Sequence, residues 1–317
     1  MTKTKKLKNS RNNDIRELVR LLVILGALCL LLFSAWRLYG IYHGYHAASQ
    51  EYDGLKDEFT HPGGGDASFA GQGDGTSAVP REVSGSGENA GGAGGEASPE
   101  EGLLIEDAAP PLSADWASLK AVNSDIVGWI YVDAEPAISY PVCRGEDNDY
   151  YLHRTFRRED LFAGSIFMDC MNAADFSDPN TVVYGHNMKN GSMFGMLKYL
   201  RLQETYDAAP YFWILTPEGN YRYHVYAAME TPVDSEAYNL FYGKGPGFLS
   251  WEKRMQAASE VGNSVPLSET DYTVTLSTCT TADTYRCVVM GKLVSSDRPR
   301  ERDDMENEVP AAADTDG

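Results

Sequence analysis

The chain has 317 residues, with 46 Asp and Glu against 27 Lys and Arg, so its formal net charge is −19 and its pI is near 4.7. This balance argues against nucleic acid as a partner, because phosphate binding needs Lys and Arg clustered on one face of a protein. The length allows one large domain or two small ones, but long polar stretches reduce the part that can fold.

The basic residues that do cluster form a leader over residues 1–20. An apolar segment follows over 21–41, and its uncharged run from Leu21 to Trp36 covers about 24 Å as a helix. Aromatic residues suited to the outer membrane interface come next: Trp36, Tyr39, Tyr42 and Tyr45. We predict a retained single-pass membrane anchor with a cytoplasmic N-terminus and an extracellular remainder. A signal peptide cleaved near Ala48 is the alternative.

Residues 42–109 are predicted to connect this anchor to a folded domain. The first part, 42–59, has the spacing of a short juxtamembrane helix. The stretch 60–102 holds thirteen glycines and almost no aliphatic residues, so it cannot bury enough apolar surface to offset its ordering entropy and is predicted to be a flexible tether. At the other end, residues 298–317 are polar and acidic and are predicted to be a disordered tail, which leaves 110–297 as the folded domain.

The folded domain is predicted to be mainly β with flanking helices. It opens with a helix capped by Ser113 or Asp115. A second helix, Pro246–Val261, is expected to bury Phe248, Trp251, Met255 and Ala258. Eight runs bounded by turn residues are predicted as strands: Val127–Val132, Ile138–Cys143, Gly164–Met168, Thr181–Tyr184, Tyr211–Leu215, Tyr221–Met229, Thr273–Ser277 and Val288–Val294. Many short strands with few helices indicate a closed or nearly closed β-barrel.

Three chemically active residues stand at the ends of predicted strands. His186 follows the β-branched run TVVYG, Cys279 ends the run TVTLSTC, and Arg286 begins the next strand seven residues later. Taken singly, each has an ordinary structural explanation as a packed thiol, a hydrogen-bonded imidazole or a surface cation. Together they predict a cysteine enzyme, because a thiolate is the nucleophile and nearby cations favour it.

The expected roles follow from the chemistry of each group. Cys279 is the nucleophile, and His186 protonates the leaving amine and later takes a proton from the incoming one. Arg286 keeps its charge and offers fixed donors to the oxyanion of each tetrahedral intermediate. The backbone N–H of Thr280, directly after the nucleophile, is the expected second donor.

The motifs place this chain in a known family by resemblance: it resembles a class B sortase of Gram-positive bacteria. The residues that carry the resemblance are DIVGWI (125–130), ISYPVC (138–143), DNDYYLHR (147–154), GSIFMD (164–169), NTVVYGHNM (180–188), GSMFGMLKYL (191–200), TLSTC (275–279) and Arg286 with the strand behind it. They cover nearly all of residues 113–294. The spacing from Cys279 to Arg286 is about one residue shorter than the family pattern.

The resemblance implies a cysteine transpeptidase on a sortase-like β-barrel of about eight strands, with a helix before the last two. Such an enzyme cleaves an NPxTN-like or NPxTG-like sorting signal after Thr and passes the protein to a cell-wall peptide amine of the lipid II type, or to a pilin amine. By motif position, four residues would line the sorting-signal groove, together with Thr280: Asn148, Leu152, Tyr184 and Ser277. We expect a monomer without a cofactor.

The remaining cysteines and histidines are expected to be structural. Cys287 alternates with Arg286 along its strand and should face the other way. Cys143 and Cys170 are predicted to pack, with a disulfide between them as the alternative. The histidines are too scattered for a zinc site, and no metal is predicted.

Two other functions remain open from the residues. A secreted cysteine peptidase would use the same Cys–His pair with water as acceptor. Papain-like enzymes, however, place Cys before His, chymotrypsin-like ones usually set the nucleophile among glycines, and neither type gives Arg286 a role. A surface binding module would leave the trio inactive, although no member of the trio is missing.

Overall fold

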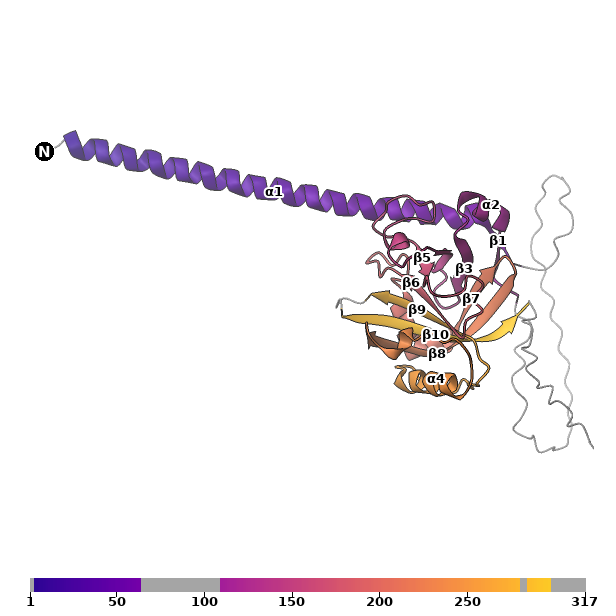
Figure 1. Cartoon of the computed structure of the whole chain (residues 1–317). Coiled ribbons are helices and arrows are strands. Elements are labelled where there is room, and N and C mark those ends of the chain that lie inside the picture. Colours follow the sequence, from indigo (N-terminus) through magenta and orange to yellow (C-terminus); the bar gives the residue numbers. More distant parts are fainter. Residues whose placement is uncertain (1–2, 64–108, 280–283, 298–317) are drawn as a thin grey trace, which may run out of the picture.

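A computed structural model describes residues 3–63, 109–279 and 284–297 of the chain (Figure 1). The predicted acidic tail and residues 64–108 of the predicted linker lie outside these ranges. The elements are, in chain order, α1 (Lys3–Phe59), β1 (Thr60–Pro62), β2 (Leu112–Ala114), α2 (Trp116–Val122), β3 (Ile126–Val132), β4 (Ser139–Arg144), η1 (Tyr150–Leu152), β5 (Ile166–Met168), β6 (Asn180–Gly185), η2 (Leu197–Arg201), α3 (Gln203–Ala208), β7 (Tyr211–Thr216), β8 (Gly219–Pro232), η3 (Glu236–Tyr238), α4 (Pro246–Ala258), β9 (Thr273–Cys279) and β10 (Tyr285–Ser296).

Eight strands close into a barrel, as the sequence predicted, in the order β10-β8-β7-β3-β4-β5-β6-β9. Two neighbouring pairs, β4–β5 and β6–β9, run parallel, and the other pairs run antiparallel. Strands β6 and β9 are buried along almost their whole length, which is typical of strands covered on both faces. Because they run parallel, their C-terminal residues arrive at the same end of the barrel.

Helix α2 begins where the sequence indicated. The Asp115 side chain caps it by accepting a hydrogen bond from the Ser118 backbone N–H at 3.0 Å. Such a cap satisfies one of the backbone N–H groups that have no partner in the first helical turn. In β3, the strand after α2, the neighbouring residues Trp129 and Ile130 are both fully buried, so the strand is covered on both of its faces.

The C-terminal end of α1 belongs to the packed domain, and here the predicted boundary at residue 110 was wrong. The helix predicted over 42–59 is present, but Tyr52, Leu55 and Phe59 are buried in the main hydrophobic core. Tyr52 also donates a hydrogen bond to the Gly164 carbonyl. Directly after the helix, β1 pairs with β2, Thr60 opposite Ala114. The helix therefore leads straight into the barrel, and Figure 1 shows its N-terminal part extending away from it.

Helix α4 covers the outer face of β8 and β10. A second apolar cluster forms between them from Phe248, Trp251 and Met255 of the helix and Tyr226, Met229, Val288 and Met290 of the strands. The predicted helix extended to Val261, but the observed one stops at Ala258, whose side chain is exposed rather than buried. The apolar spacing was correct over the first three turns and failed at the last.

A buried acid, Glu252, lies on the same face of α4 and was not predicted. Its side chain has no exposed surface and accepts a hydrogen bond from Thr273 Oγ1 on β9 at 2.8 Å. Burial raises its pKa to about 8, because a charged carboxylate loses solvation there. The group is therefore mostly protonated at neutral pH.

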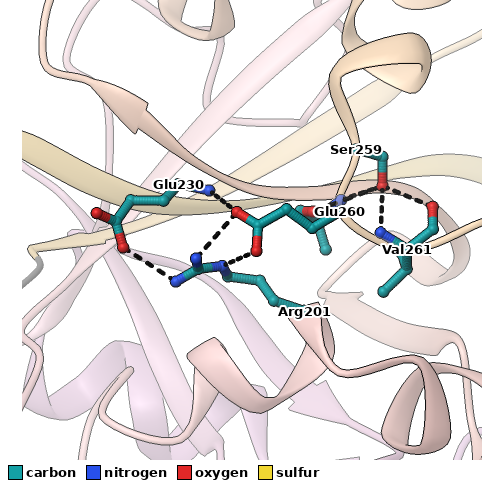
Figure 2. Close-up of polar contacts among 6 residues, drawn as sticks. Arg201, Glu230, Ser259, Glu260 and Val261 are labelled. Atoms are coloured by element: carbon teal, nitrogen blue, oxygen red, sulfur yellow. Dashed lines mark hydrogen bonds and ion pairs between the residues drawn. The ribbon is translucent and has the colours of Figure 1, made fainter.

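A charged bridge joins three parts of the chain outside the barrel. The guanidinium of Arg201, at the end of η2, contacts both oxygens of Glu260 at 2.9 and 3.0 Å and Glu230 on β8 at 3.1 Å (Figure 2). The Glu260 carboxylate also accepts a hydrogen bond from the backbone N–H of Glu230 at 2.8 Å. A two-pronged Arg–carboxylate contact fixes orientation as well as distance. The Arg201 contacts hold η2, which follows the His186 loop in the chain, against β8 and against the segment after α4.

Candidate active site

The parallel pair β6–β9 places the predicted nucleophile beside the predicted proton carrier. In the register of this pair, Gly185 is opposite Thr278. His186 directly follows Gly185 in the chain, and Cys279 directly follows Thr278. On the other side of β9, the backbone of Arg286 is opposite that of Cys279. Adjacent strands lie about 4.8 Å apart, so the three backbone positions form one row. Of Cys279 the structure describes the backbone.

A pocket of about 270 Å³ opens at this end of the barrel. Its lining contains every predicted site residue whose side chain is described, namely Asn148, Leu152, Tyr184, His186, Ser277 and Arg286, together with Phe167, Gly185 and Thr278. Thr280, the predicted second oxyanion donor, lies outside the described residues. The residues of four separate motifs thus converge on one pocket, although the sequence separates them by more than one hundred positions.

His186 is half-buried and held from the Leu152 loop. Its Nε2 lies 2.7 Å from the Leu152 carbonyl oxygen, and because a carbonyl only accepts hydrogen bonds, Nε2 carries the proton. The His153 ring stacks on it with centroids 5.7 Å apart. Burial lowers the pKa of His186, the bond to Leu152 opposes that shift, and His153 adds to it. In its neutral form the imidazole therefore keeps Nδ1 as the nitrogen that can take a proton.

Arg286 extends a fixed cation into the pocket from the start of β10. Its Nη1 donates to the carbonyl of Tyr285 at 2.9 Å, and its side chain is partly exposed. The next residue, Cys287, is 2 % exposed, because alternate strand residues face opposite sides. Arg286 thus lines the pocket, and Cys287 is buried as packing on the other face, as the alternation predicted for Cys287.

Asp169 organises one wall of the pocket and was missed by the sequence analysis. It is 8 % exposed, and its Oδ2 accepts hydrogen bonds from Asn148 Nδ2 at 3.0 Å and from the Tyr184 hydroxyl at 2.9 Å. Asn148 Oδ1 in turn accepts from the backbone N–H of Cys170 at 2.8 Å. These bonds fix two predicted groove residues through one carboxylate. The only local signal was an acid directly after strand β5, which is also an ordinary turn position.

Replacing Asp169 by Asn should weaken peptide binding more than turnover. In Asp169, Oδ2 accepts the bonds from Asn148 and Tyr184, and Oδ1 accepts a third from the Met171 backbone N–H at 2.9 Å. An amide has only one acceptor oxygen, so in either orientation its NH2 group faces a donor and at least one of the three bonds is lost. We expect KM for a sorting-type peptide to rise roughly tenfold, with kcat changed less. Asp178→Asn, in the following loop, is the matched control. An unchanged KM would remove Asp169 from this positioning role.

The segment between β8 and α4 contacts two of the residues that line the pocket. The hydroxyl groups of Tyr238, in η3, and Ser277, on β9, lie 2.9 Å apart. The Tyr238 ring also stacks on Tyr184, with centroids 6.4 Å apart. Tyr238 was not predicted as a site residue, because nothing in its local pattern distinguishes it from a loop aromatic. The contact brings the α4 segment to the edge of the pocket.

The described cysteines other than Cys279 are free thiols. Cys143 and Cys287 are buried, and loss of solvation raises the pKa of both, that of Cys287 to about 12. A thiol in that state is a poor nucleophile at neutral pH. The Cys143–Cys170 disulfide, considered as an alternative above, is not formed, because both residues are free.

No group of three or more His, Cys, Asp or Glu side chains in the described part of the chain is arranged to hold a metal ion.

Comparison with known proteins identifies the family. The sequence profile described as "Sortase: Sortase domain" matches residues 135–294. The chain is 38% identical over 181 residues to Sortase B of Listeria monocytogenes, covering 56% of this chain and 73% of that protein. It is 31% identical over 180 residues to Sortase B of Staphylococcus aureus, with the same two coverages.

A solved structure agrees with these matches. The crystal structure of sortase B from B. anthracis, in complex with AAEK1, superposes with a TM-score of 0.52 at 35% identity, over 56% of this chain and 83% of that one. The closed eight-stranded barrel with an N-terminal helix is therefore the sortase B fold. The chain belongs to the sortase family, class B, and is a cysteine transpeptidase of that family.

Proposed function

We propose that this transpeptidase cleaves an NPxTN-like or NPxTG-like sorting signal after Thr and transfers the protein to an amine of a cell-wall peptide. The observation that carries the proposal is the row formed by His186, Cys279 and Arg286 at the mouth of one pocket. Membership of the sortase family supports the general reaction. The signal, the acceptor and the roles of individual residues are inferred from the pocket.

In the proposed reaction, the Cys279 thiolate attacks the Thr carbonyl carbon and forms a tetrahedral intermediate. The C–N bond then breaks, and His186 as an imidazolium gives its proton to the leaving amine. The incoming amine attacks the thioester, gives a proton to the neutral His186, and expels the Cys279 thiolate. Protons balance over the two halves, and the enzyme returns to its starting state.

Charge develops on the carbonyl oxygen in both halves, and Arg286 is proposed to stabilise it. Its guanidinium remains protonated at any working pH and offers several donors in one plane. Donors placed in advance for a developing oxyanion stabilise the transition state more than the ground state. The backbone N–H of Thr280 stays a prediction as the second donor.

The sorting signal is proposed to lie along the pocket walls. Leu152 offers the apolar surface, and Asn148, Tyr184 and Ser277 offer polar groups held in place by Asp169 and Tyr238. A site whose polar groups are already bonded to neighbours is rigid before the peptide arrives, which reduces the ordering cost of binding.

Helix α1 is proposed to anchor the enzyme in the membrane, with the barrel outside the cell. It contains a span long and apolar enough to cross a bilayer, with none of that apolar window buried inside the protein. The basic leader before it favours a cytoplasmic N-terminus. Because α1 continues into the barrel core through Tyr52 and Leu55, the proposed anchor and the catalytic domain share one helix.

The decisive experiment offers the full-length chain in detergent micelles a fluorogenic sorting-type peptide, with and without an amine such as triglycine. Full length is needed, because removing residues before 103 would strip Leu55 and Phe59 from the core. We expect slow cleavage without amine, a thioacyl adduct by mass spectrometry, and a faster, amine-linked product when amine is added.

Two outcomes would contradict the proposal. Product that never incorporates the added amine would indicate a cysteine peptidase, with water as the acceptor. Absence of both adduct and cleavage across NPxTN and NPxTG peptides would indicate that the proposed signal class is wrong.

A further inference from the structure

A second pocket lies where α1 passes the barrel, away from the catalytic one. It has a volume of about 550 Å³ and is lined by Trp36, Arg37, Gly40 and Tyr45 of α1 and by Phe162 and Lys189 of the barrel loops. None of these residues lines the catalytic pocket. We call it the junction pocket.

The barrel meets the helix at this pocket through a specific aromatic contact. Phe162 lies edge-on to Tyr45, with ring centroids 5.1 Å apart. Gly44 makes the approach possible, because a Cβ there would stand 2.9 Å from the Phe162 ring. Phe162 nevertheless keeps 44% of its surface exposed. The loop therefore rests on the helix and still presents an apolar surface outward.

The charges of the junction pocket are positive and come from two elements. Arg37 and Lys189 are both exposed, and within the described part of the chain neither forms an ion pair with a carboxylate. The nearby acid Asp160 is already paired with Arg154 at 3.3 Å. In a chain of net charge −19, two cations around one hollow are complementary to an anion.

The level of the pocket along α1 indicates which anion. The apolar run ends at Trp36, and Arg37 and Gly40 lie within about 6 Å of it along the helix axis. That rise is similar to the thickness of one headgroup layer, roughly 5–7 Å. Trp and Tyr at this level are typical of the membrane interface. If α1 spans the membrane, the part of the pocket formed by Trp36, Arg37 and Gly40 stands among lipid headgroups, and Tyr45, about 14 Å beyond Trp36 along the helix, lies on the outer side of them.

We propose that the junction pocket binds the phosphate of an anionic phospholipid and thereby holds the barrel against the membrane surface. Arg37 and Lys189 contact the phosphate, while Trp36, on the side of the apolar run, contacts the glycerol and upper acyl chain. The proposal rests on the anchoring role given to α1 under the proposed function. It adds a lipid site shared by anchor and barrel, instead of a barrel free to turn on a tether.

The site would orient the catalytic pocket because the same loops build both. Lys189 is three residues after His186. The residue before Phe162, Leu161, donates its backbone N–H to the His153 carbonyl at 2.9 Å, and His153 stacks on His186. A lipid bound in the pocket that Phe162 and Lys189 line would therefore fix the height and direction of the catalytic opening above the membrane.

The test uses the full-length chain in nanodiscs, with retained lipid measured by native mass spectrometry. Three lipid conditions are compared: phosphatidylcholine alone, phosphatidylcholine with phosphatidylglycerol, and the latter with excess inorganic phosphate. The variant is the double substitution Arg37→Gln and Lys189→Gln. The matched control is Lys198→Gln with Lys253→Gln, which removes the same charge from exposed positions elsewhere on the barrel.

We expect the wild type and the control to retain phosphatidylglycerol and the double variant to retain roughly tenfold less, given the contribution of each cation near a lipid surface. Equal retention by the double variant, or equal retention of phosphatidylcholine, would overturn the proposal. Displacement by inorganic phosphate would also overturn it, since the site would then bind a free ion.

Formation of the Cys279 thioacyl adduct is measured in the same samples. An adduct without selective lipid retention contradicts the junction-pocket proposal alone. Lipid retention without an adduct supports the lipid site and contradicts the proposed chemistry.

Discussion

Replacing Cys279 by Ala is expected to abolish peptide cleavage and transfer, with a fall in kcat/KM on the order of 10⁴-fold or more. The reason is that the other described thiols are placed differently: Cys143 and Cys287 are buried, with pKa values raised by burial, Cys29 lies in the apolar span of α1, and Cys170 does not line the catalytic pocket. The measurement is cleavage of the fluorogenic peptide, together with the adduct mass. The adduct should disappear completely.

The matched control for this change is Cys287→Ala. Cys287 is opposite Thr278 in the β9–β10 register, close to the nucleophile along the sheet, but it packs on the other face. Removing its thiol should leave catalysis near the wild-type rate and lower stability by about 1 kcal/mol through the lost packing. If Cys279→Ala still cleaves the peptide, or if Cys287→Ala no longer forms the adduct, then Cys279 is not the nucleophile.

Replacing Arg286 by Lys is expected to lower kcat by roughly 10²- to 10³-fold, although the charge is kept. An ammonium group is a single compact donor centre, whereas the guanidinium presents donors in one plane that can meet both the substrate oxygen and the Tyr285 carbonyl. At present Nη1 is bonded to that carbonyl at 2.9 Å. The Lys side chain cannot hold this bond and also reach the oxyanion in the same geometry.

The effect of Arg286→Lys should appear in kcat and kcat/KM together, because the oxyanion exists only in the transition states and intermediates. Arg254→Lys, on the exposed side of α4, is the control for the same chemical change. Thermal unfolding of both variants shows that the fold is kept. A rate within a factor of a few of wild type would mean that Arg286 does not stabilise the oxyanion.

Local patterns were sufficient to find the strands. All eight predicted strands exist, because β-branched and aromatic runs between turn residues are a local property of the sequence. The helix caps were equally local, and Asp115 acts as one of the two predicted. Errors occurred where packing decides: α4 ends before Val261, Ala258 is exposed rather than buried, and the burial of Glu252 was not predicted.

Local sequence patterns were not sufficient to predict how the site residues come together. Nothing in the runs around His186 and Cys279 states that their strands are parallel neighbours, since pairing across 93 positions is set by the whole barrel. The family resemblance supplied that step. Asp169 and Tyr238 were missed for the same reason, because each acquires its role only through distant partners.

The helix predicted over 42–59 is present, but its partner could not be predicted, because Tyr52, Leu55 and Phe59 could have faced solvent, lipid or protein. Only the folded barrel shows that they pack on protein: the Tyr52 ring lies 5.5 Å from that of Tyr140, and the Phe59 ring lies 6.2 Å from that of Phe156.

Strand order in the barrel also has a consequence for how the enzyme matures. Strand β9 lies between β6 and β10, so the sheet stays open along one seam until these last two strands have been added. Strands so far apart in the sequence pair slowly, because a long loop must close, at a cost in entropy, before any contact between them forms. Cys279 and His186 are therefore brought together only when β9 pairs with β6, and the site is complete only after that step.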